Sequence, residues 1–83
     1  MKIIYSEDYN DYCILPKERL DKYRKPVVYV KFGPDAAIFS LDGSILHGSL
    51  PEKQLEKARK LVIHNRVLFY MEWMKINNPI KES

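Results

Sequence analysis

The stretch that most constrains the fold runs from Ser49 to Ile76, where apolar residues recur at helical spacing. Ser49 and Glu52 form a Ser-x-x-Glu pattern, in which the two side chains satisfy free backbone N–H groups at a helix start. Pro51 is tolerated in the first turn, and the pattern ends before Pro79. The spacing therefore predicts one continuous helix over 49–76.

One side of this helix is an apolar stripe typical of a helix that lies on a β-sheet. The stripe consists of Leu55, Ala58, Val62, Phe69, Trp73 and Ile76. In the second half of the helix the opposite side is also apolar, so something must cover it. Either the segment from Tyr9 to Leu15 folds over it, or a protein partner packs on it.

Trp, Tyr and Met side chains are frequent anchors in protein interfaces. The candidate interface is therefore formed by Tyr70, Met71, Trp73 and Met74. At 83 residues, a chain buries only about 60% of its unfolded surface, so association would stabilise it. We expect a homodimer through the second half of the helix, and a different protein partner is the alternative.

Short β-strands are predicted at residues 2–5, 27–32 and 36–41, which are rich in β-branched or aromatic residues. Asp42-Gly43 predicts a two-residue hairpin that pairs Leu41 with Ser44, Phe39 with Leu46 and Ile38 with His47. Residues 9–24 lack a clear period and are interpreted as an ordered, irregular excursion, in which a strand fragment at Cys13, Ile14 and Leu15 is the alternative. The predicted fold class is α+β: a small antiparallel sheet of three to four strands packed on one long C-terminal helix, in a single domain over residues 1–83.

The alternation of the strands assigns residues to two faces of the sheet. The face toward the helix is expected to carry Val28, Val30, Phe32, Phe39, Leu41 and Leu46, and the opposite face Tyr29, Lys31, Ile38, Ser40, Ile45 and His47. The opposite face is too apolar for a fully wet surface and too polar for a core, which favours a groove or an interface. Its candidate binding residues are Tyr29, Lys31, Ser40 and His47, with Arg24 and Lys25 as basic residues from the preceding segment.

No catalytic constellation emerges from the titratable residues. His47 is the best single candidate for acid–base chemistry, because an imidazole changes charge near neutral pH. Cys13, His47 and His64 lack the spacing of metal ligands, and no glycine-rich phosphate loop is present. We expect no catalytic residue, no metal and no cofactor.

The expected location is the cytoplasm. The first residues are too few and too soon followed by acidic residues for a signal peptide, and the lone Cys13 has no internal disulfide partner. No apolar run approaches the roughly 18 residues of a membrane span, so we expect no membrane association. Basic residues gather between Lys17 and Lys31 and along the helix, although the formal net charge is only +3. Nucleic acid is therefore a weakly supported alternative partner.

The segment from Pro26 to Trp73 resembles the small bacterial domain of unknown function 4160 family. The resemblance rests on a strand that ends V-K-F-G at Gly33, a second short strand, a D-G turn, and an L-x-G-x-L-P run that leads through Pro51 into a long helix with a late Trp. The resemblance implies a similar fold and a function that depends on a protein partner of the toxin–antitoxin kind. The family's Pro-His-Phe-His run is Pro26-Val27-Val28-Tyr29 in this chain, so histidine-dependent chemistry does not carry over.

Three functions remain open from the sequence. The first is a non-enzymatic protein-interaction module of the toxin–antitoxin or host–phage conflict type. The second is an RNA-binding or RNA-cleaving toxin, in which Lys22, Arg24, Lys25 and Lys31 hold phosphates and His47 assists cleavage. The third is a binder of a small anionic metabolite or nucleotide on the outer face of the sheet.

Overall fold

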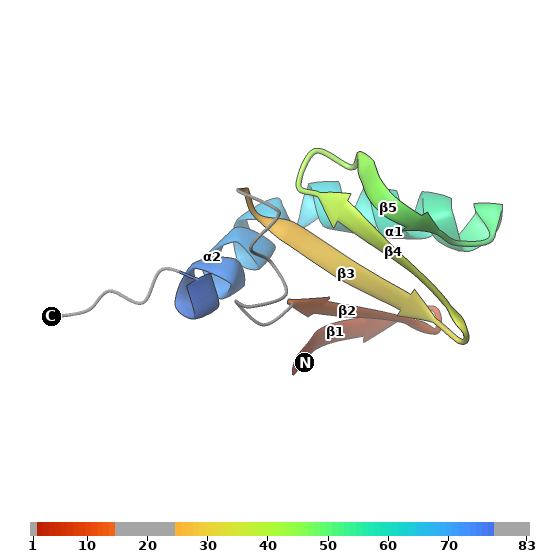
Figure 1. Ribbon diagram of the computed structural model, residues 1–83, viewed down its shortest axis with the longest axis horizontal. Helices are drawn as coiled ribbons and strands as arrows, with labels where there is room; N and C mark the ends of the chain where they lie inside the picture. The colour runs from red at the N-terminus through yellow and green to blue at the C-terminus, as the bar shows by residue number, and fades with distance from the viewer. Residues whose placement is uncertain (1, 15–24, 78–83) are drawn as a thin grey trace, which may run out of the picture.

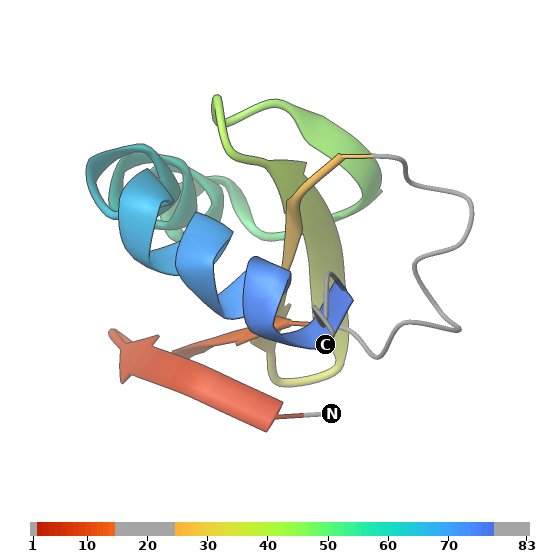
Figure 2. The same ribbon diagram turned by 90° about the vertical axis from the view of Figure 1, so that its left-hand side faces the viewer.

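The computed structural model describes residues 2–14 and 25–77, which form a five-stranded antiparallel sheet followed by two helices (Figure 1). The elements are β1 (Lys2–Glu7), β2 (Asn10–Ile14), β3 (Val27–Phe32), β4 (Asp35–Ser40), β5 (Ile45–Ser49), α1 (Glu52–His64) and α2 (Arg66–Asn77). The strands lie in the sheet in chain order, and both helices lie on the same face of the sheet (Figure 2). The candidate residues Lys22 and Arg24 lie outside the described residues.

The predicted fold class is wrong in two respects. The sheet has five strands rather than three to four, and the C-terminal region forms two helices of 13 and 12 residues rather than one long helix. The architecture is still α+β, with a helix layer packed on an antiparallel sheet. Neither difference is visible in the apolar periodicity of the sequence.

The additional strand is β2, which lies inside the segment interpreted as irregular and extends well before the strand fragment considered at residues 13–15. It pairs with β1 on one side and β3 on the other, and Tyr12, Cys13 and Ile14 are buried. The β1–β2 hairpin turns at Asp8 and Tyr9, whose φ angles are 54° and 70°. Positive φ at both central residues is the geometry of a type I′ turn, which favours Asn-Gly, Asp-Gly or Gly-Gly. Because Tyr9 occupies the position where Gly is usual, the Asp8-Tyr9 pair gave no turn signal.

The β3–β4 hairpin follows the prediction closely. The predicted bounds of β3 are confirmed, and β4 begins one residue earlier than expected. Phe32 lies opposite Asp35, so the loop has the even length needed to keep the alternation in phase. Val28, Val30 and Phe39 consequently reach the core beneath the helices, as predicted.

The β4–β5 hairpin differs from the predicted two-residue turn. Gly43 N donates to Ser40 O at 3.0 Å and Ser40 N donates to Ser44 O at 2.8 Å, which closes a three-residue loop. The predicted pairing of Ile38 with His47 is confirmed, whereas the predicted pairs Leu41–Ser44 and Phe39–Leu46 are wrong.

A register shift follows in β5, where Phe39 lies opposite Ile45 instead of Leu46. Because one residue is inserted, the two neighbouring side chains exchange faces relative to the prediction. Ile45 packs against the core under the helices, and Leu46 packs against Val27 and Ile38 on the other side of the sheet.

The main core lies between the sheet and the helix layer. Its buried members are Tyr12, Val28, Val30, Ala37, Phe39, Leu50, Ala58, Val62 and Phe69. The rings of Tyr12 and Phe69 pack with centroids 6.0 Å apart, which joins α2 to β2. Complete burial of Ala58, Val62 and Phe69 confirms this part of the predicted helical stripe, whereas Leu55, Trp73 and Ile76 are half-buried.

The first helix does not begin at the predicted capping box. Ser49 is the last residue of β5, where it lies opposite Ala36, so its backbone belongs to the sheet. Helix α1 begins at Glu52 with Pro51 as its N-cap and without a side-chain cap. The capping pattern is therefore overridden by strand pairing.

The helix layer breaks at Asn65, which has φ −113° and ψ 25°. The side-chain amide of Asn65 donates to Leu61 O at 3.0 Å, and the His64 ring nitrogen Nδ1 lies 3.0 Å from Lys60 O. Side chains that bond to backbone carbonyls in this way compete with the helical hydrogen bonds and bend or end helices. The bend lets α2 contact β2 and β3, while α1 contacts β3 and lies behind β4 and β5 in the view of Figure 1.

Candidate functional site

The candidate functional surface is an apolar stripe on the side of α2 that faces away from the sheet. We define the α2 stripe as Val67, Tyr70, Met71 and Met74, whose spacing places them on one helix face. Val67, Tyr70 and Met71 are 67%, 44% and 55% exposed, whereas Phe69 on the opposite side is completely buried. The stripe therefore presents large apolar side chains to solvent.

The four predicted interface residues do not stay together. Tyr70 and Met71 are exposed and Met74 is half-buried. Trp73 packs against the cluster of Val27 and Ile38, so it belongs to the internal packing of the chain. Leu68 lies beside the stripe and is 42% exposed. It was not among the predicted interface residues, although it belongs to the same apolar run of the sequence and could have been included on that ground.

The alternative covering for this surface was the segment from Tyr9 to Leu15. Residues 10–14 form β2 within the sheet, and Tyr12 packs beneath Phe69 rather than over the outer side of α2. Tyr9 stands at the hairpin tip and is 88% exposed. Leu15 lies outside the described residues. Residues 9–14, the described part of this segment, therefore do not cover the α2 stripe.

On the outer face of the sheet, the structure aligns only part of the predicted polar cluster. Tyr29, Ile38 and His47 lie side by side on β3, β4 and β5. Lys31 is exposed and lies opposite Ala36, one pair further along this face, and Lys25 is exposed just before β3. The row therefore contains one titratable imidazole with a tyrosine and an apolar side chain.

Ser40 has a structural role instead of the predicted binding role. It is 4% exposed and donates its hydroxyl to Asp42 Oδ1. The backbone N–H of Ser44 donates to the same carboxylate oxygen at 2.9 Å. These hydrogen bonds, the Ser40 hydroxyl first, lower the pKa of Asp42 to about 2. The cluster thus stabilises the β4–β5 turn.

The buried thiol of Cys13 is not a candidate nucleophile. Burial raises its pKa, and the nearby Asp11 carboxylate raises it further. A raised pKa keeps the sulfur protonated, and a thiol is a much weaker nucleophile than a thiolate. Among the described residues, no three His, Cys, Asp or Glu side chains come close enough to hold a metal ion.

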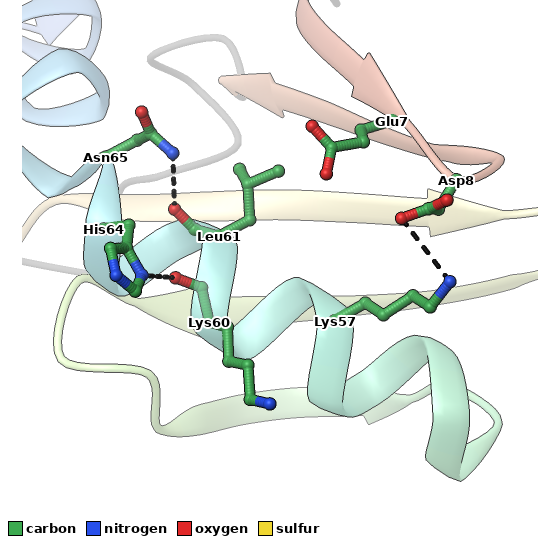
Figure 3. Close-up of a pocket in the computed structure, with 7 residues that line it drawn as sticks. All are labelled: Glu7, Asp8, Lys57, Lys60, Leu61, His64 and Asn65. Atoms are coloured by element: carbon green, nitrogen blue, oxygen red, sulfur yellow. Dashed lines mark hydrogen bonds and ion pairs between the residues drawn. The ribbon is translucent and has the colours of Figure 1, made fainter.

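A groove that the sequence did not predict lies between the β1–β2 hairpin and α1 (Figure 3). Its volume is about 330 Å³, and it is lined by Glu7, Asp8, Lys57, Lys60, Leu61, His64 and Asn65. Asp8 and Lys57 form an ion pair across it at 3.5 Å. Sequence spacing gave no signal for this groove, because its acidic wall depends on the unpredicted hairpin.

A buried amide network holds the two walls of the groove together. Gln54 Nε2 donates to Asp8 O at 2.8 Å and to Asn10 Oδ1 at 3.0 Å. Asn10 Nδ2 in turn donates to Gln54 O at 3.3 Å. Because both side chains are buried, these hydrogen bonds fix the hairpin against the first turns of α1.

Comparison of the chain with models of known protein families, with curated proteins and with solved structures finds no match. The resemblance of residues 26–73 to a known family therefore rests on the residue pattern alone. In residues 2–14 and 25–77, neither helix is long and apolar enough to cross a membrane.

Proposed function

We propose that this chain is a non-enzymatic protein-interaction module that binds a protein partner through the α2 stripe. The observation that carries the proposal is the exposure of Val67, Tyr70 and Met71 at helical spacing on one face. Isolated apolar residues are common on protein surfaces, but a contiguous patch of large side chains is typical of an interaction site. The toxin–antitoxin or host–phage setting is part of this proposal and is supported by the resemblance.

The first partner in this proposal is a second copy of the chain. A homodimer would bury the same stripe from both subunits, since a twofold interface brings identical surfaces together. Helix faces with anchors at i, i+3, i+4 and i+7 pack well against another helix or into a groove. The bend at Asn65 favours this use, because it holds Phe69 in the core and leaves the opposite side of α2 outside.

The test compares the wild-type chain with the double variant Val67→Asp/Met71→Asp. Both positions are more than half exposed, so the variant is expected to fold. The wild-type chain should have a dimer mass in sedimentation, and the variant should be a folded monomer. A wild-type chain that stays monomeric and also retains no protein partner on co-purification would contradict the proposal. The variant Pro34→Asp, exposed at the β3–β4 turn away from the stripe, serves as the control.

A further inference from the structure

A basic ridge runs along the outer side of α1 and ends where the α2 stripe begins. We define the basic ridge as Lys53, Lys57, Lys60 and His64, which follow one another at steps of four, three and four residues. Such steps place side chains on one helix face. Val67 and Met71 follow on α2 beyond the break at Asn65, so the helix layer has a basic outer side on α1 and an apolar one on α2.

Part of this positive charge is not neutralised within the described chain. Lys57 reaches toward the hairpin and pairs with Asp8, whereas Lys60 points away from it (Figure 3). Lys53 and Lys60 are exposed and form no ion pair with any other described residue. Glu56 lies beside the ridge, but it is paired with Arg59 at 3.0 Å. The ridge therefore presents two lysines and an exposed imidazole.

We infer that the heterologous partner of this module is an acidic protein segment with an apolar end. Its apolar anchors pack on Val67 and Met71, and its carboxylates lie over Lys53 and Lys60. The inference rests on the proposed function and adds the chemistry of the partner. Complementary charge beside an apolar contact sets the orientation of a bound segment and speeds its association.

A second copy of the chain does not satisfy this ridge. Twofold pairing through the α2 stripe brings α2 against α2 of the second copy, and the acidic residue on α2, Glu72, already pairs with Lys75 at 3.2 Å. Binding of an acidic segment would therefore gain contacts that self-association lacks, and the segment would replace the second copy on α2.

Nucleic acid and lipid fit the surface less well than an acidic protein segment. Bases of single-stranded RNA stack on rows of aromatic side chains, but the α2 stripe offers one aromatic side chain, Tyr70, among Val67, Met71 and Met74. A helix that lies in a membrane interface has its charged and apolar faces on opposite sides along its length. Here the charged and apolar parts follow one another along the helix layer.

The test uses a labelled helical peptide of about 18 residues, about 27 Å long. One half carries Glu at the contact positions and the other half carries Leu. A peptide of identical composition, with Glu and Leu alternating along the contact face, is the control. Fluorescence anisotropy at about 0.05 M salt should show the ordered peptide binding about tenfold more tightly than the control peptide. The difference should shrink at about 0.5 M salt, where exposed charges are screened.

Two protein variants with equal net charge locate the acidic contact. Lys60→Gln removes one positive charge from the ridge, and Pro34→Asp adds one negative charge at the exposed β3–β4 turn. Lys60→Gln should weaken binding of the ordered peptide about threefold to fivefold at low salt. Lys53→Gln/Lys60→Gln should weaken it about tenfold, and Pro34→Asp should leave it unchanged within about twofold.

The outcomes separate this inference from the proposed function. Suppose that Val67→Asp/Met71→Asp abolishes peptide binding, but Lys53→Gln/Lys60→Gln binds the ordered peptide as tightly as the wild-type chain does and the alternating peptide binds as tightly as the ordered one. In that case only the acidic-partner inference fails. If Val67→Asp/Met71→Asp binds as the wild-type chain does, the docking face itself is wrong. Tighter binding of an oligouridine RNA or of vesicles with anionic lipid than of the ordered peptide would also overturn the inference.

Discussion

At the scale of single residues, Gly48 shows how tightly the edge of the sheet is built. Its φ is +81°, and a Cβ at this position would lie 2.3 Å from Ala36 O and 3.1 Å from Ala37 Cα. These are backbone atoms of the neighbouring strand, so they move only if β4 and β5 separate. Gly33 has a similar φ of +59°, but a Cβ there meets nothing within 4 Å.

The two glycines therefore predict different costs for the same substitution. Gly33→Ala should lower the free energy of unfolding by about 1 kcal/mol, the cost of a left-handed conformation for a residue with a Cβ. Gly48→Ala should cost at least about 2 kcal/mol, because the steric conflict with the backbone is added. Urea unfolding of both variants measures the difference. Equal midpoints would contradict the close approach of β4 and β5.

Asp42 predicts a pH dependence of stability at the β4–β5 turn. Its pKa in the folded chain is about 2, below its ordinary value of 3.8, because Ser40 and Ser44 donate hydrogen bonds to the carboxylate. A depressed folded pKa contributes stability that is present above pH 3.8 and is lost as the pH falls toward 2. The free energy of unfolding should therefore fall less steeply between pH 4 and pH 2 in Asp42→Asn than in the wild-type chain. Parallel curves would remove Asp42 from this dependence.

At the scale of elements, the sequence predicted the features that depend on periodicity. The bounds of β3 and the buried stripe through Ala58, Val62 and Phe69 follow from alternation and helical spacing, and both are confirmed. The break at Asn65 does not alter that spacing, so one helix and two helices give the same apolar pattern. A tertiary requirement, the packing of α2 across β2, decides between them.

The errors at β2 and at Ser49 have a related cause. The Asp8-Tyr9 turn adopts positive φ with Tyr9 where Gly is usual, so the hairpin that creates β2 lacks the usual two-residue signature. Ser49 has a strong local signature for a helix cap, but pairing with Ala36 keeps it in β5. In both places long-range contacts outweigh local preference. The groove between Asp8 and Lys57 was unpredictable for the same reason.

The amide network between the β1–β2 hairpin and α1 gives a prediction at the element scale. Asn10→Ala and Gln54→Ala should each lower the free energy of unfolding by about 1–3 kcal/mol, because each leaves buried polar groups without partners. The double variant should cost less than the sum, with a coupling of about 1 kcal/mol. Urea unfolding of the four chains measures this coupling. Strict additivity would show that the two side chains act independently.

At the scale of the whole molecule, the two sides of the helix layer have different roles. Its inner side closes the core with Val62 and Phe69, and its outer side carries the basic ridge and the α2 stripe. A small domain has little surface to spare for exposed Val, Tyr and Met unless they are covered in use. The stability of the chain should therefore depend on what occupies the stripe.

Self-association through the stripe predicts that thermal stability rises with protein concentration. Mass action stabilises a folded dimer by about 1.4 kcal/mol for each tenfold increase in concentration, or about 0.7 kcal/mol per chain. For a domain of this size the melting temperature should rise by roughly 4 °C per tenfold increase. Val67→Asp/Met71→Asp should melt at the same temperature at every concentration. Calorimetry distinguishes the two cases, with the Pro34→Asp chain as the control. A wild-type melting temperature that does not change with concentration would exclude the dimer and leave the stripe available to a different protein.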